Sequence, residues 1–154
     1  GFGVTILAYD KYKSNFGNDC VKESVLNELF AETDILSIHL PYTTETHYYV
    51  DQPFLQQFKK NIYLINTARG QCLNTTDLVK NMESGKVLGA CLDVLEYEGI
   101  SFEKLDSEEI PSPLQYLFKS NKVILSPHIA GWTVESHEKI SAILASKIFK
   151  CLQY

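Results

Sequence analysis

The sequence lacks the features that would place it in a membrane, on a nucleic acid or in a disulfide scaffold. No apolar run approaches the roughly 18 residues of a membrane-spanning helix, and no signal peptide is visible. The formal net charge is −5, which argues against nucleic acid as a partner. The 4 cysteines contain no CxxC pair, so they indicate neither a zinc site nor a disulfide framework, and we expect a cytoplasmic protein. Cys91 lies inside an apolar run and is expected in the core.

Short apolar runs that alternate with helical patterns make up most of the chain. The runs are near-continuous, which is typical of parallel strands covered on both faces. Strands are predicted at residues 4–9, 35–40, 62–65, 87–92 and 123–125, and helices at 21–31, 53–59, 75–84 and 134–152. Asn18 or Asp19 is expected to cap the first helix, and Asn74 the third. The alternation predicts one α/β domain with a doubly wound parallel sheet.

The connection at residues 95–122 is longer than the others. Connections of this length are usually functional or mobile, and one helical turn is predicted inside it at 114–119. Acidic side chains gather in its first half: Glu96, Glu98, Glu103, Asp106, Glu108 and Glu109.

Side chains that can bind ligands or move protons follow the predicted strands. Because the carboxyl ends of parallel strands meet at one edge of a sheet, where open α/β sheets bind their ligands, we expect these side chains to form one site. They are Asp10; His39 and Pro41; Thr67, Ala68 and Arg69; Asp93 and Glu98; and His128.

Asp10 and Arg69 indicate what that site binds. A carboxylate after the first strand can accept both ribose hydroxyls of an adenosine and repel a 2′-phosphate, which favours NAD over NADP, although Lys11 and Lys13 weaken that exclusion. A turn or helix-cap role for Asp10 is equally compatible with its position. The guanidinium of Arg69 can clamp a carboxylate and a neighbouring carbonyl oxygen, unless it is a plain surface arginine.

His128 follows the last predicted strand, where an imidazole can exchange a proton near neutral pH. A carboxylate bonded to the far ring nitrogen would fix the tautomer and favour the protonated ring, and either Glu98 or Glu96 can supply it. Such a pair can give a proton to a ketone oxygen while hydride arrives at the carbon. A lone histidine can also cap a helix or fill a surface gap, and we expect plain surface or packing roles for His47 and His137.

Five segments carry a resemblance to a known family: YDKYK, TDILSIHLPYTTET, INTARG, GACLDVLEYE and VILSPHIAGWT. They resemble the NAD-binding domain of the D-isomer-specific 2-hydroxyacid dehydrogenases. In that family an arginine holds the 2-oxo acid, a histidine is the general acid/base and a glutamate supports it; by motif these are Arg69, His128 and Glu98. The resemblance also implies that Asp10 binds ribose and Asp93 contacts the nicotinamide of NAD. It implies a cofactor cleft lined by His39, Pro41, Thr46, Thr67, Ala68 and Gly131.

The implied substrate is a small 2-hydroxy or 2-oxo acid, with phosphoglycerate or glycerate dehydrogenase as favoured activities. The intact protein is expected to form a homodimer, as relatives do.

Two parts of the family pattern are absent. The G-x-G-x-x-G sequence, with the strand before it and the helix after it, does not stand upstream of the first predicted strand, and Gly1-Phe2-Gly3 does not replace it. The separate substrate-binding domain is absent too, and the last helix is expected to lead back toward it. We therefore expect residues 1–154 to form a partial NAD-binding domain, with an incomplete Rossmann-like sheet in two pieces and little or no turnover by this chain alone.

Two other activities stay open. The C-terminal-binding transcriptional co-repressors resemble the same family, so an NAD(H)-sensing binding module is the alternative to an enzyme. Formate dehydrogenase is a relative with glutamine where a glutamate would partner the histidine, and Glu98 argues against it.

Overall fold

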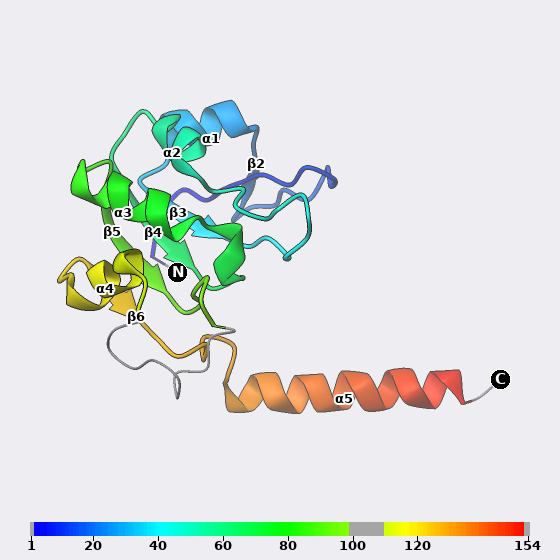
Figure 1. The fold of residues 1–154 in the computed structure, drawn as a ribbon. Coiled ribbons are helices and arrows are strands. Elements are labelled where there is room, and N and C mark those ends of the chain that lie inside the picture. Colours follow the sequence, from blue (N-terminus) through cyan, green and yellow to red (C-terminus); the bar gives the residue numbers. More distant parts are fainter. Residues whose placement is uncertain (1, 99–109, 153–154) are drawn as a thin grey trace.

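A parallel sheet with crossover helices forms the centre of the molecule, which confirms the α/β class predicted from the sequence. The computed structural model describes residues 2–98 and 110–152. The sheet has the order β3-β4-β5-β6, and every neighbouring pair is parallel (Figure 1). Its strands agree closely with the predicted ones: β3 (Ile35–Ile38), β4 (Ile62–Asn66), β5 (Val87–Leu92) and β6 (Val123–Leu125).

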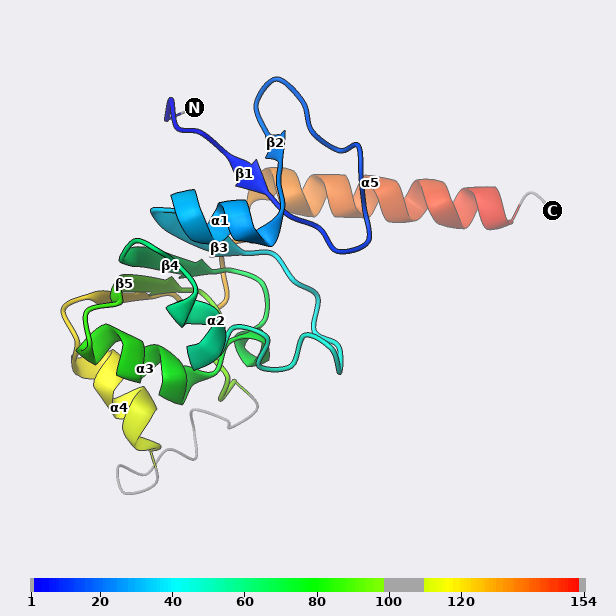
Figure 2. The same ribbon diagram turned by 90° about the horizontal axis from the view of Figure 1, so that it is seen from above.

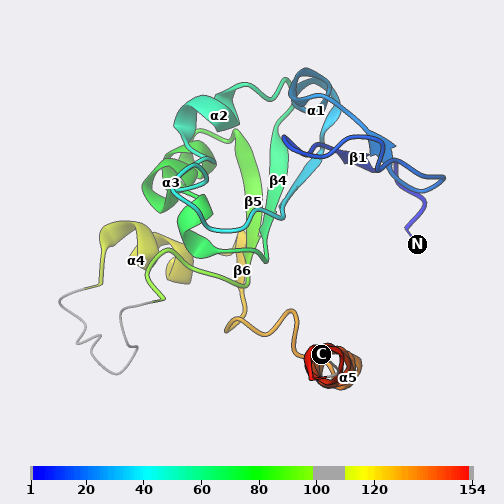
Figure 3. The same cartoon turned by 90° about the vertical axis from the view of Figure 1, so that its right-hand side faces the viewer.

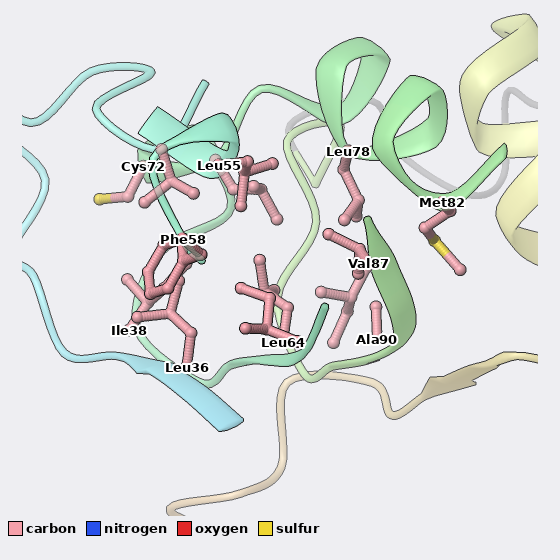
Figure 4. Close-up of a cluster of buried hydrophobic side chains, with 14 of the residues drawn as sticks. Leu36, Ile38, Leu55, Phe58, Leu64, Cys72, Leu78, Met82, Val87 and Ala90 are labelled. Carbon is pink, nitrogen blue, oxygen red and sulfur yellow. The ribbon is translucent and has the colours of Figure 1, made fainter. Parts of the chain in front are cut away.

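The crossover helices lie on one face of this sheet (Figure 3). They are α2 (Gln52–Gln56), α3 (Thr75–Glu83) and α4 (Ser112–Lys119), the last of which is longer than the single turn expected there. A sequential strand order with crossovers of one hand places every crossover helix on the same face. Between helices and sheet lies the core, in which Leu55, Leu64 and Leu78 are fully buried (Figure 4). Each such side chain contributes roughly 1.5–3 kcal/mol by leaving water.

The opposite face of the sheet is open over the described part of the chain. Ile35, Tyr63, Leu88 and Ile124 point to it and are 58%, 52%, 38% and 67% exposed. Cys91 lies on this face and is exposed, so its predicted place in the core is wrong. Coverage of both faces is also wrong for the residues described, because none of the three crossover helices can reach the second face.

A second, two-stranded sheet forms near the amino terminus. In it β1 (Leu7–Ala8) pairs in parallel with β2 (Lys22–Glu23), so the described residues form two sheets, as expected. The first helix, α1 (Leu26–Glu32), is shorter than predicted and has no side-chain cap at Val25. Two causes displaced its start.

The first cause is backbone pairing. Lys22 N donates to Ile6 O at 2.9 Å and Ser24 N to Ala8 O at 2.8 Å, so these amides serve a strand instead of a helix. The second is local. Asn18 Oδ1 accepts from the amides of Cys20 and Val21 in a turn that precedes the helix, and neither Asn18 nor Asp19 caps it.

The cap predicted for the third helix is confirmed. Asn74 Oδ1 accepts from Asp77 N at 3.0 Å and begins α3, and Gly85 follows its end with a φ of +78°. A 3-10 turn, η1 (Gly70–Cys72), was not predicted.

The last helix, α5 (Val134–Cys151), extends away from both sheets (Figures 1 and 2). Its apolar stripe, formed by Ile140, Ile143, Leu144 and Ile148, is 53–59% exposed. Among the helices described, none is long and apolar enough to cross a membrane.

Candidate functional site

The carboxyl ends of β3, β4, β5 and β6 meet at one edge, because all four strands are parallel. The side chains singled out in the sequence follow these ends directly. His39 and Pro41 come after β3, Thr67, Ala68 and Arg69 after β4, Asp93 and Glu98 after β5, and His128 after β6.

His128 and Glu98 form a pair at this edge. His128 Nδ1 lies 3.1 Å from Glu98 Oε2, and the two side chains are 51% and 35% exposed. The other carboxylate oxygen of Glu98 accepts from Leu95 N at 2.8 Å. The glutamate is therefore oriented by its own turn toward the ring, and Nε2 is left to face a ligand. The acidic residues Glu103, Asp106, Glu108 and Glu109 lie outside the described residues.

Glu96, the other candidate partner of His128, is engaged elsewhere. Its carboxylate accepts from the Tyr48 hydroxyl and, at 3.0 Å, from Thr75 N at the start of α3. The hydrogen bond to Glu96, with some burial, raises the pKa of Tyr48 to about 12. Both oxygens of Glu96 thus hold loops together, and the geometry favours Glu98 as the partner of the ring.

Asp93 anchors the turn that carries His128. It is 4% exposed, and its Oδ1 accepts from Ser126 Oγ at 2.6 Å and Ile129 N at 2.9 Å, while Oδ2 accepts from Ala130 N at 2.9 Å. Burial acts to raise the pKa of Asp93, but these hydrogen bonds and the nearby His128 together lower it.

The backbone of His128 is held in an unusual conformation. Its φ is +55°, in the left-handed region that a side chain with Cβ rarely adopts, and its N–H donates to Asp93 O at 2.9 Å. Non-glycine residues in this region persist where surrounding contacts impose them, often at functional sites.

Arg69 follows a turn that buried Asn66 shapes. Asn66 Oδ1 accepts from Ala68 N at 3.0 Å, and Asn66 Nδ2 donates to Arg69 O at 3.1 Å. The guanidinium is exposed, and its Nη1 donates to Ala68 O at 2.6 Å. Gly70 then passes so close to Leu95 that a Cβ there would overlap the Leu95 carbonyl. The arginine turn therefore packs directly against the loop that carries Glu98.

Asp10 lies at the end of β1 in a turn of its own. Its Oδ1 accepts from Tyr12 N at 2.9 Å and Lys13 N at 3.0 Å, which is the turn role considered for it. Over the described parts of the chain Oδ2 accepts no hydrogen bond, so the exposed carboxylate can still accept from a ribose.

The loop after β3 approaches this turn. Thr46 Oγ1 donates to Pro41 O at 2.6 Å and accepts from Thr43 N at 2.8 Å, which shapes the loop. Glu45, in the loop after β3, accepts hydrogen bonds from the Lys11 ammonium and the Tyr12 hydroxyl in the turn after β1. The residues predicted to line the cofactor cleft thus come from neighbouring loops, whereas the Cβ position of Gly131 faces open space.

Sequence reasoning missed Ser126, Tyr48 and Glu45. Ser126 stands at a strand end, the same cue that selected the other residues. Tyr48 and Glu45 offer no local cue, because their partners are 48 and 33–34 positions away. Within residues 2–98 and 110–152 no group of three or more His, Cys, Asp or Glu residues could hold a metal ion.

Comparison with known proteins identifies a matching family and similar relatives. The family described as D-isomer specific 2-hydroxyacid dehydrogenase, NAD binding domain, matches residues 1–130. A D-specific alpha-keto acid dehydrogenase of Enterococcus faecium is 38% identical over an alignment of 139 residues, which covers 88% of this chain and 42% of the relative. A glyoxylate reductase of Thermofilum pendens is 37% identical over an alignment of 156 residues, which covers 99% of this chain and 42% of the relative.

Solved structures agree. The chain is similar to the NAD-complexed D-isomer specific 2-hydroxyacid dehydrogenase of Lactobacillus delbrueckii ssp. bulgaricus, with a TM-score of 0.86, 29% identity and coverage of 98% of this chain and 46% of that one. The Aquifex aeolicus D-lactate dehydrogenase, complexed with NAD and lactic acid, gives a TM-score of 0.78 and 33% identity, covering 99% and 47%. The chain spans less than half the length of each of these relatives.

Proposed function

Because this chain belongs to the D-isomer specific 2-hydroxyacid dehydrogenases, in their NAD binding domain, we propose that it carries the cofactor-binding and proton-transfer half of an NAD-dependent oxidoreductase. The proposed reaction interconverts a D-2-hydroxy acid and its 2-oxo acid. NAD, when bound, supplies or accepts the hydride. Asp10 would hold its ribose, since Oδ2 has no protein partner among the described residues, and the loops of Pro41–Thr46 and Thr67–Ala68 would flank it.

The proposal assigns Arg69 to the substrate and His128 to the proton. The Arg69 guanidinium would clamp the carboxylate and carbonyl oxygen of the acid, which fixes the carbonyl for reduction. His128 Nε2 would donate a proton to that oxygen during reduction and remove the hydroxyl proton in the reverse direction. Glu98 would hold the tautomer and stabilise the charged ring through Nδ1. The Nδ1–Oε2 distance of 3.1 Å, at the edge shared with Arg69, is the observation that supports these roles best.

The finer parts of the proposal concern the intact protein. Lactate- and glyoxylate-sized acids are the first substrates to test, since relatives are named for them, with glycerate and phosphoglycerate beside them. We include a homodimer and a cytoplasmic location, as inferred from the sequence. Helix α5, with its exposed apolar stripe, would lead toward a substrate-binding domain.

The test is a substrate screen on the full-length protein that contains residues 1–154. Oxidation of NADH is followed with pyruvate, glyoxylate, hydroxypyruvate and phosphohydroxypyruvate. The variant His128→Gln is expected to lose about 10²–10⁴-fold in kcat, the usual contribution of a positioned acid/base. The matched control is His137→Gln, on α5 and away from the edge, which is expected to keep wild-type kcat.

Equal activity of His128→Gln and wild type would contradict the proposal. NAD-dependent association with no hydride transfer to any of these acids would instead favour the NAD(H)-sensing module.

A further inference from the structure

Glu45 joins two loops that are distant in the sequence. Its two carboxylate oxygens contact the Lys11 ammonium and the Tyr12 hydroxyl, which lie 34 and 33 positions earlier. These contacts lie beside Asp10, whose Oδ1 holds the amides of Tyr12 and Lys13. The Lys11 ammonium also lies 5.4 Å from the centre of the Tyr12 ring.

This cluster contributes little to stability. The Lys11 and Glu45 side chains are 59% and 43% exposed, and ion pairs in that situation are nearly neutral for folding because water and salt screen them. The effect of the cluster is on the local charge that a ligand of Asp10 would meet.

That charge bears on the choice between NAD and NADP. A 2′-phosphate carries close to two negative charges at neutral pH and would lie against the Asp10 carboxylate. Lys11 is the residue next to Asp10, and its ammonium would compensate that repulsion if it were available. Glu45 forms an ion pair with this ammonium and so adds a second carboxylate beside Asp10. The Tyr12 hydroxyl donates a hydrogen bond that holds the Glu45 carboxylate in place.

We propose that Glu45 is a specificity-determining residue, which makes the adenosine site selective for NAD by keeping Lys11 away from the 2′-phosphate position of NADP. The inference rests on the proposed role of Asp10 as the ribose-binding residue. It adds a second residue, Glu45, which acts on the adenosine site only by holding Lys11 and does not itself contact the cofactor.

The test measures binding of NAD⁺ and NADP⁺ to the full-length protein that contains residues 1–154, by NMR. The shifts of the Tyr12 and Lys13 amides report on Asp10 directly and detect millimolar affinities. The measured quantity is the ratio of the two dissociation constants, Kd for NADP⁺ over Kd for NAD⁺. For Glu45→Gln the ratio is expected to fall roughly tenfold, the effect of releasing one unit charge near a dianion in water. The fall should shrink as salt is raised.

Three further variants keep the test decisive. Glu28→Gln is the matched control, because Glu28 is also paired with a lysine, Lys22, but on α1; its ratio is expected to equal that of wild type. In the double variant Glu45→Gln/Lys11→Met the ratio is expected to return to at least the wild-type value. Should Glu45→Gln fail to fold, Lys11→Met alone is expected to leave the ratio at or above wild type, and a fall would overturn the proposal.

The other outcomes distinguish a failure of the Glu45 role from a failure of the proposed ribose role of Asp10. An unchanged ratio in Glu45→Gln, an equal fall in Glu28→Gln, or a fall that persists in the double variant would each overturn the role of Glu45 alone. If both nucleotides bind the full-length wild-type protein and neither moves the Tyr12 and Lys13 amides, the ribose role of Asp10 fails, and the role of Glu45 fails with it.

Discussion

Gly70→Ala tests whether the arginine turn and the glutamate loop are held in register by direct backbone contact. A Cβ at Gly70 would overlap the carbonyl carbon and oxygen of Leu95 and lie 2.5 Å from Glu96 N. Ordinary contacts begin near 3.4 Å, so the two segments must separate by about 1 Å or more. Neither can yield easily, because Glu96 is bonded to the Tyr48 hydroxyl and to Thr75 N.

Overpacking of this kind costs about 1–3 kcal/mol, and we expect the upper end because the clash is with backbone. For a protein of this size that corresponds to a fall in Tm of roughly 5–10 °C. Urea unfolding followed by circular dichroism measures this loss in the free energy of unfolding. The pKa of Tyr48 should also fall from about 12, since displacement of Glu96 removes its main cause.

The matched control is Gly131→Ala, whose Cβ would meet no atom within 4 Å and whose stability should stay within about 0.5 kcal/mol of wild type. If Gly70→Ala were as stable as Gly131→Ala, the contact would not constrain the two segments. The inference that it brings Arg69 toward Glu98 would then be wrong.

Three further substitutions test other parts of the site. Glu96→Gln should lower the pKa of Tyr48 toward its ordinary 10.0, measured by NMR titration of labelled tyrosine; an unchanged titration would refute the bond. Asp93→Asn should lower the free energy of unfolding by about 2 kcal/mol at pH 7. Because the native pKa of Asp93 is depressed, that difference should disappear as pH falls through it, below the ordinary 3.8, whereas a difference that persists at low pH would contradict the sign. His128→Gly should be as stable as wild type within about 1 kcal/mol in urea, because glycine relieves the φ of +55° while only a half-exposed ion pair is lost; a large loss would show that the turn is not strained.

The strands of the four-stranded sheet and most helix ends could be predicted, because they depend on near neighbours. Asn74 caps α3 through an amide three residues away, and the apolar run at 87–92 is a strand with those bounds. The start of α1 could not be predicted, because the amides of Lys22 and Ser24 bond to the carbonyls of Ile6 and Ala8, sixteen positions earlier. The open sheet face was missed for a similar reason. An apolar run does not show whether a helix covers it.

The sequence by itself determined the chemical groups at the sheet edge and their order, since polar residues after parallel strands must gather there. Only the tertiary structure decided between Glu96 and Glu98, which are two residues apart and alike in chemistry. Their carboxylates differ in what the fold brings to them: Tyr48 and the start of α3 for one, His128 for the other. The same is true of Lys11, whose charge counts against NAD selectivity in the sequence and is neutralised in the structure by Glu45. Hydrogen bonds and ion pairs act over a few ångströms, so the partner of a charged side chain depends on distances that chain position alone does not contain.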